Sequence, residues 1–133
     1  MLNKLFFAVL LSILFALPLK ADTEKFLCAL QYASETSALG GVKSLSPKEF
    51  GATIFELKIS KQGMAFSAGT AFGDNTLVVD SYDKRDIGSY LLVKASDETT
   101  MLTFMKRRGL SFLNATRINE FAVSSFAAKC ENF

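Results

Sequence analysis

The chain has 133 residues, of which 50% are hydrophobic and 12% aromatic, and its 15 basic and 13 acidic side chains give a net charge of +2. This length and composition suit one small domain with a single apolar core. There is no histidine, which excludes Ser-His and Cys-His catalysis and removes the commonest ligand of transition metals. Glycine-rich phosphate loops and EF-hand calcium loops are also absent from the sequence. We therefore expect no cofactor, and an enzymatic role has little support.

The N-terminal segment has the pattern of a secretory signal peptide. Lys4 precedes an apolar run over residues 5–19, and Ala21 stands before a polar flank. We expect cleavage after Ala21, so that residues 1–21 are the signal peptide and residues 22–133 form a single exported β domain. An uncleaved membrane anchor is the alternative, but a spanning helix needs about 20 apolar residues and this run is shorter. We therefore expect no stable membrane span after cleavage, and a periplasmic or extracellular location.

The leader also carries part of the positive charge. Lys4 and Lys20 leave with it and no acid does, so the mature chain keeps 13 basic and 13 acidic residues and has no net charge. Nucleic-acid binding usually requires a strong and clustered basic excess. We therefore expect no nucleic-acid partner.

The two cysteines bracket the mature chain. Cys28 lies near its start and Cys130 near its end. Thiols of exported proteins oxidise and stay oxidised, and two cysteines allow only one intramolecular pairing. A redox role has little support, because the sequence has neither a C-x-x-C motif nor a histidine to activate a thiolate. We expect a structural disulfide between Cys28 and Cys130.

Residues 24–39 fit two kinds of element. Four side chains in this stretch alternate as the inward face of a strand would: Phe26, Cys28, Leu30 and Tyr32. With Thr23 as a cap and Gly40 and Gly41 as a stop, a helix of about fifteen residues is the alternative. We favour a strand, which would place Cys28 in the interior, and keep a short N-terminal helix as the other interpretation.

The rest of the chain has the period-two pattern of β structure. Residues 34–50 are rich in Ser and Gly and predict a connection, whereas residues 51–69 predict a hairpin with a turn at 61–63. A loop composition follows over 69–75. Further strands are predicted from the alternation of apolar and polar side chains over 76–82, 89–96, 100–105, 110–116 and 120–130, with turns at 83–88 and 106–109. We therefore expect a mainly β fold, a small antiparallel sandwich or barrel of about seven to eight short strands closed by one disulfide.

Two charged segments are candidate contact sites for a partner. The first mixes a tyrosine with charged side chains, a composition favoured in binding surfaces because Tyr and Arg are common anchors: Tyr82, Asp83, Lys84 and Arg85. The second is the densest basic stretch and could meet phosphates or an acidic protein: Lys106, Arg107 and Arg108. Ordinary solvated turns have the same composition, so neither segment is specific.

Carboxylates are the remaining side chains that could catalyse a reaction or bind a metal. Asp80, Asp83 and Asp86 recur at every third residue, and Asp74, Asp97 and Glu98 also fall near predicted strand ends. Such groups can hydrolyse glycosides or bind calcium if they converge, but Lys84 and Arg85 would oppose a metal.

The sequence therefore predicts an exported, non-enzymatic binding or structural module that acts on a protein or envelope component. Two alternatives remain open. A carrier of a small apolar ligand would use a cavity inside a barrel of eight strands, and a small carboxylate-dependent hydrolase would use two converging acids.

Overall fold

The computed structural model describes residues 23–46, 53–66 and 76–133. The predicted signal peptide and the predicted loop over 69–75 lie outside these residues, as do residues 47–52. The described chain is almost entirely β, with nine strands and one short 3₁₀ segment: β1 (Glu24–Ser37), β2 (Gly41–Ser44), β3 (Ile54–Ile59), β4 (Gly63–Phe66), β5 (Thr76–Arg85), η1 (Ile87–Ser89), β6 (Tyr90–Ser96), β7 (Thr100–Arg107), β8 (Leu110–Ile118) and β9 (Ala122–Asn132).

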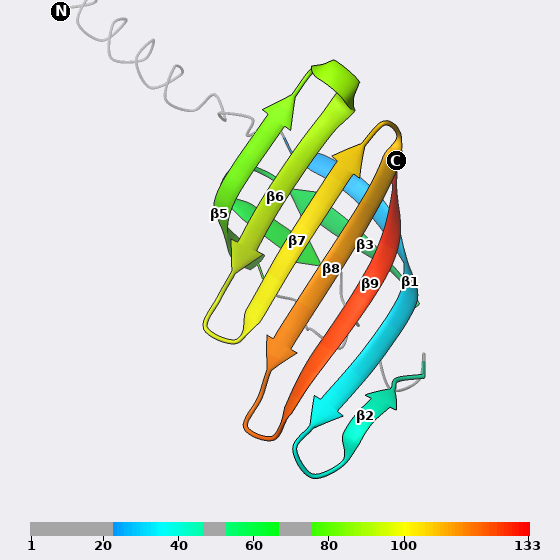
Figure 1. Ribbon diagram of the computed structural model, residues 1–133. Coiled ribbons are helices and arrows are strands. Elements are labelled where there is room, and N and C mark those ends of the chain that lie inside the picture. The colour runs from blue at the N-terminus through cyan, green and yellow to red at the C-terminus, as the bar shows by residue number, and fades with distance from the viewer. Residues whose placement is uncertain (1–22, 47–52, 67–75) are drawn as a thin grey trace, which may run out of the picture.

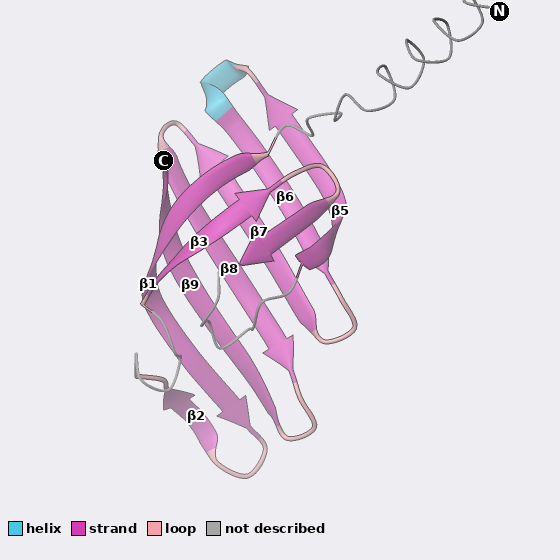
Figure 2. Ribbon diagram, turned by 180° about the vertical axis from the view of Figure 1, so that it is seen from behind, coloured by secondary structure: helices cyan, strands magenta, loops and turns pink. Residues whose placement is uncertain are grey.

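The strands form a closed antiparallel barrel. Each strand from β3 to β9 pairs with the next along the chain, and β1 pairs with both β3 and β9, so eight strands close on themselves while β2 is an additional strand on β1. In Figure 1, β1 and β9 run side by side, and β3 passes behind the sheet formed by β5 to β9. Figure 2 shows β3 from the other side, crossing over that sheet. The predicted mainly β fold of about seven to eight strands is therefore confirmed, as a barrel.

β1 is a strand along its whole length, so the helix considered for residues 24–39 is wrong. Its first half pairs with β3 and its second half with β2, while its other edge pairs with β9 from Phe26 to Ser37. Tertiary pairing on both edges satisfies the backbone hydrogen bonds of β1, which outweighs the local helix propensity of this stretch.

A bulge in β1 shifts its alternation. Leu30 pairs with Ala128 and Tyr32 with Ala127, so Gln31 is the additional residue. Phe26 and Cys28 are buried before the bulge and Ala33 after it, and Tyr32 is 54% exposed. The prediction that Tyr32 shares the inward face of Phe26 and Cys28 was therefore wrong, because an inserted residue reverses the parity of all that follow.

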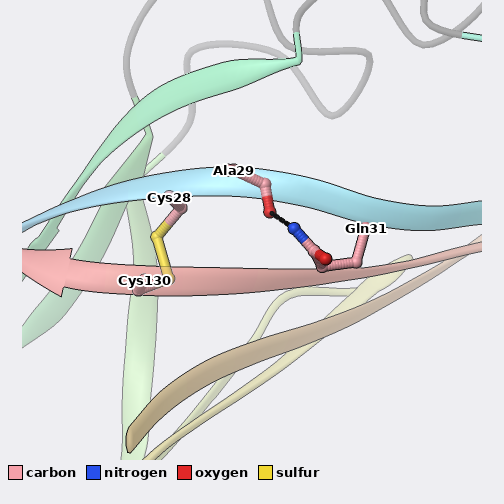
Figure 3. Close-up of a disulfide and its surroundings, with 4 residues drawn as sticks. All are labelled: Cys28, Ala29, Gln31 and Cys130. Carbon is pink, nitrogen blue, oxygen red and sulfur yellow. Dashed lines mark hydrogen bonds between the residues drawn. A yellow bond between two sulfur atoms is a disulfide. The ribbon is translucent and has the colours of Figure 1, made fainter. Parts of the chain in front are cut away.

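Cys28 and Cys130 form a disulfide, as predicted. They are paired partners on β1 and β9, with their Cα atoms 4.0 Å apart, and Figure 3 shows the bond crossing between the two strands. Both residues belong to the buried core. The bond therefore fixes the seam at which the first and last strands close the barrel.

The barrel interior is packed with apolar side chains. The rings of Phe26 and Phe104 lie 4.5 Å apart between centroids, and those of Phe55 and Phe126 meet edge to face at 5.8 Å. In β3 the predicted alternation is confirmed, since the inward residues of the strand are buried and the residues between them are exposed.

Three predicted boundaries need correction. Residues 41–44 were assigned to a connection but form β2, whose four residues are all exposed and have no apolar alternation to reveal them. Residues 83–85 were assigned to a turn but continue β5, with Asp83 paired to Leu92 and Arg85 to Tyr90. β7 continues in the same way through Arg107, which pairs with Leu110. Charged residues at the end of a barrel strand remain paired along the backbone while their side chains reach solvent.

Candidate functional site

The two charged segments singled out in the sequence meet at one end of the barrel. η1 follows β5, and the turn at residues 108–109 follows β7; both lie at the upper end of the sheet in Figure 1. The backbone amide of Arg108 donates a hydrogen bond to the carbonyl oxygen of Gly88, with an N–O distance of 2.9 Å. We call this end of the barrel the cationic mouth, and define it by the following residues: Glu24, Lys84, Arg85, Asp86, Tyr90, Lys106, Arg107 and Arg108.

Local backbone geometry explains why these turns form here. Gly88 and Gly109 have φ values of 74° and 80°, in the left-handed region that glycine enters without strain. Arg108 also has a positive φ, of 50°, which is uncommon for a residue with a β-carbon. The glycines tighten both turns and bring their backbones close enough to bond.

The outer part of the mouth is a groove lined by three arginines. It lies between Arg85 and Tyr90 on one side and Arg107 and Arg108 on the other, with the side chain of Ile87 beside it. Ile87 is 92% exposed.

Arg85 is held in place within this groove. Its Nε and NH2 groups donate hydrogen bonds to the two carboxylate oxygens of Asp83, at 3.2 and 2.9 Å, and its guanidinium lies 5.2 Å from the centre of the Tyr90 ring. The hydrogen bond and the charge of Asp83 raise the pKa of Arg85. Asp83 thus neutralises Arg85, which leaves the other two arginines as the open cations of the groove.

Arg107 and Arg108 have no ion pair or side-chain hydrogen bond with any residue that the structure describes. Both are exposed, at the end of β7 and in the turn that follows it. A guanidinium presents donors in a planar fork that matches carboxylate and phosphate groups. Two adjacent unpaired forks on a tight turn make this the strongest candidate for binding an anion.

The inner part of the mouth is a recess with two lysines and two carboxylates, those of Glu24 and Asp86. Lys84 and Lys106 are both paired partners of the buried Leu91, so their side chains share its inward face. Lys84 Nζ lies 3.6 Å from Glu24 Oε1, and Lys106 Nζ donates a hydrogen bond to Asn132 Oδ1 at 3.2 Å. Lys106 Nζ also lies 5.9 Å from the centre of the Phe26 ring. Charged groups therefore cover the apolar core at this end.

Tyr82 lies apart from the other predicted contact residues. It is half-buried and packs against the core, and it pairs with Val93. The tyrosine that lines the groove is Tyr90, on β6. Glu24 was also missed, because its contact with Lys84 joins β1 to β5 and no local pattern shows this pairing.

Three of the predicted acids have separate local contacts. Asp80 accepts a hydrogen bond from Ser96 Oγ at 2.6 Å, Asp83 pairs with Arg85, and Asp97 accepts hydrogen bonds from the amides of Thr99 and Thr100. Asp86 lines the inner recess together with Glu24. Among the described residues, no group of three or more His, Cys, Asp or Glu side chains could hold a metal ion. Asp74 lies outside the described residues, and Asp80, Asp83 and Asp86 do not form one site.

Two further findings bear on where the protein acts. No helix within the described parts of the chain is long and apolar enough to cross a membrane. The disulfide indicates an oxidising, exported compartment.

No family model matches the chain, and neither a curated protein nor a solved structure shows significant similarity to it.

Proposed function

We propose that this protein is an exported, non-enzymatic binding module, periplasmic or extracellular, that holds an anionic partner at the cationic mouth. The partner is a protein or an envelope component that bears carboxylate or phosphate groups. The observation that carries the proposal is the hydrogen bond between Arg108 and Gly88, because it joins the turn that follows Arg85 to the turn that contains Arg108, from separate hairpins, into one surface.

The charges of the mouth support an anionic partner. Lys84, Lys106 and Arg85 each have a polar or charged neighbour within the described chain, whereas Arg107 and Arg108 have none. Partner-contact residues are typically exposed Arg and Tyr on a rigid scaffold. The closed barrel supplies that scaffold, since strands β5 to β8 are hydrogen-bonded on both sides.

The two alternatives gain less support. A carrier of an apolar ligand needs space inside the barrel, and the described interior holds large buried side chains, among them the contacting pair Phe26 and Phe104. A carboxylate-dependent hydrolase needs two acids free to act in a cleft. Asp80, Asp83 and Asp97 are held by neighbouring residues, and the two acids of the inner recess, Glu24 and Asp86, lie there with Lys84, Arg85 and Lys106.

The test is a titration of the exported protein with inorganic phosphate, followed by amide chemical shifts in NMR spectra. We expect the largest shifts at Gly88 and at residues 107–109, and we expect binding to weaken at high salt. The double variant Arg107→Glu/Arg108→Glu should lose the response. The control Lys94→Glu/Lys129→Glu makes the same change in net charge at two exposed positions of the outer sheet face, and should keep it. Equal loss in both variants would show that net charge alone attracts the anion.

A further inference from the structure

One carboxylate in the cationic mouth has unused capacity to accept hydrogen bonds. Glu24 Oε2 is buried, and none of the described residues hydrogen-bonds to it. The other oxygen, Oε1, lies 3.6 Å from Lys84 Nζ, which is longer than the distance of about 2.7–2.9 Å typical of a charge-assisted hydrogen bond. An ionised carboxylate offers about four acceptor positions. Glu24 therefore lacks the donors that a carboxylate beside the end of a core normally has.

The Glu24 carboxylate is within reach of a ligand. Its side chain is 25% exposed and lines the inner recess. The terminal torsion of a glutamate side chain is broad and roughly two-fold, so a half-turn about the Cγ–Cδ bond exchanges its two oxygens. A donor that enters the recess can therefore meet an oxygen of Glu24 without a change in the backbone.

The recess and the outer groove adjoin one another. Arg85 and Tyr90 line both hollows, with Glu24 in the inner one and Arg107 and Arg108 in the outer one. A single ligand that extends past Tyr90 would meet guanidinium donors at one end and a carboxylate acceptor at the other. Such a site discriminates against a simple anion, because a simple anion supplies no donor to Glu24.

We propose that the mouth binds a phosphate ester that carries an ammonium or hydroxyl donor a few bonds from its phosphate. The phosphate lies at Arg107 and Arg108, and the donor at Glu24. This inference rests on the proposed function, since it names the ligand class of the same site. A phosphoethanolamine-type lipid headgroup and a free phosphate monoester share this chemistry.

The test compares two soluble ligands that differ in their donors. Phosphoethanolamine has an ammonium with N–H groups, whereas phosphocholine has the same phosphate and positive charge but no N–H. Binding of each to the exported protein is measured by NMR titration. We expect phosphoethanolamine to bind on the order of tenfold more tightly than phosphocholine, because one additional hydrogen bond to a charged group contributes about this much affinity. Equal affinities would overturn the proposal.

Two variants assign the preference to Glu24. Glu24→Gln removes the charge at nearly constant shape and leaves only a neutral acceptor oxygen, so it should lower the ratio of the two affinities while inorganic phosphate still binds. Lys84→Ala removes the ion-pair partner but keeps the carboxylate, and should preserve the ratio even if both affinities fall. Thermal unfolding of each variant verifies that it is folded. An unchanged ratio in Glu24→Gln would overturn the proposal.

A vesicle experiment distinguishes the two sources of the ligand. Vesicles contain phosphatidylglycerol with either phosphatidylethanolamine or phosphatidylcholine, and sedimentation measures bound protein. Preference for phosphatidylethanolamine that depends on Glu24 would indicate a lipid headgroup, whereas preference with soluble ligands alone would indicate a free ester. If inorganic phosphate also fails to bind the unaltered protein, the proposed function fails with it. If phosphate binds but donors make no difference, only the present inference fails.

Discussion

Arg108 and Gly88 belong to different hairpins, yet the amide of Arg108 donates a hydrogen bond to the carbonyl oxygen of Gly88 at 2.9 Å. The cationic mouth is therefore held together by its backbone and does not depend on the charged side chains themselves. Ligand-binding side chains can then vary in charge while the two turns stay in place. Each end of this hydrogen bond lies at a residue with positive φ, which makes the contact sensitive to substitution.

Gly88→Ala tests this backbone contact. The new β-carbon would meet no atom within 4 Å, so the effect comes only from the φ value of 74°. Placing an L-residue in the left-handed region costs about 1–2 kcal/mol. We expect denaturant unfolding to show a loss of about 1 kcal/mol, and amide hydrogen exchange to show weaker protection at Arg108. Gly41→Ala is the control: its φ is 67° and its new β-carbon also meets no atom within 4 Å, so it should cost a similar amount and leave protection at Arg108 unchanged. Unchanged protection at Arg108 would contradict the prediction.

The disulfide should contribute much of the stability. It closes a loop of 102 residues, and removal of a native disulfide from a small domain typically costs about 2–5 kcal/mol. The double variant Cys28→Ala/Cys130→Ala should therefore melt about 10 °C lower by calorimetry. Thiol labelling of the unaltered protein without reduction should detect no free thiol. A melting temperature that does not change would mean that the β1–β9 pairing alone holds the seam.

Two phenylalanines on neighbouring strands should differ sharply in their contribution to the free energy of unfolding. Phe104 on β7 is fully buried against Phe26, whereas Phe112 on β8 is 40% exposed on the outer face. We expect Phe104→Ala to lower the free energy of unfolding by about 3–5 kcal/mol, because it leaves a cavity in the core. Phe112→Ala should cost about 1 kcal/mol or less. Chemical denaturation of both variants measures the difference, and similar losses would refute the assigned inward and outward faces.

Asp97 should make stability depend on pH in acid. Hydrogen bonds from the Thr99 and Thr100 amides lower its pKa from 3.8, with the Thr99 bond as the largest cause. A carboxylate with a lowered folded-state pKa stabilises the protein above its unfolded pKa, and this contribution is lost as the pH falls through the folded value. The stability difference between the unaltered protein and Asp97→Asn should therefore shrink below about pH 4. Urea midpoints at neutral and acidic pH measure it.

The neighbouring substitution Glu98→Gln is the control for this prediction. The described residues form no hydrogen bond to the Glu98 side chain. We expect its stability difference to stay small at both pH values. If Asp97→Asn and Glu98→Gln respond alike to acid, the turn hydrogen bonds are not the source of the pH dependence.

Asp83 should restrain anion binding at the mouth. Asp83 accepts hydrogen bonds from Arg85 Nε and Nη2. Asp83→Asn should therefore free the guanidinium of Arg85 to bind a ligand beside those of Arg107 and Arg108. An exposed ion pair is worth up to about 1 kcal/mol, so inorganic phosphate should bind roughly two- to fivefold more tightly. Titration calorimetry at low salt measures this change. Weaker binding would show that the fixed orientation of Arg85 matters more than its free charge.

The period-two pattern predicts the strands of the hairpins because one face of each strand is buried. It fails at β2, where all four residues are exposed and no burial imposes alternation. It also fails at Tyr32, since the bulge at Gln31 reverses the face without any glycine or proline to mark it. The disulfide was predictable because only one pairing of Cys28 with Cys130 exists.

The candidate site was predictable only in parts. The basic residues 106–108 and the segment 83–85 stand out in composition, but their contact depends on the register of β5 with β6 and β6 with β7. Register of this kind is set by turns and by packing across the barrel, which no single segment encodes. Glu24 and Tyr90 join the site for the same reason, through pairings between strands.

The pairing of β1 with β9 also decides when the fold can be completed. β1 is the first described strand to be synthesised and β9 the last, and they are paired at eleven positions from Phe26 to Ser37. Until β9 has been synthesised, one edge of β1 is unpaired, and an unpaired strand edge can pair with another chain. Long-range pairing of this kind also slows folding. Because Cys28 and Cys130 are paired partners on β1 and β9, the disulfide locks this last pairing once β9 has docked on β1.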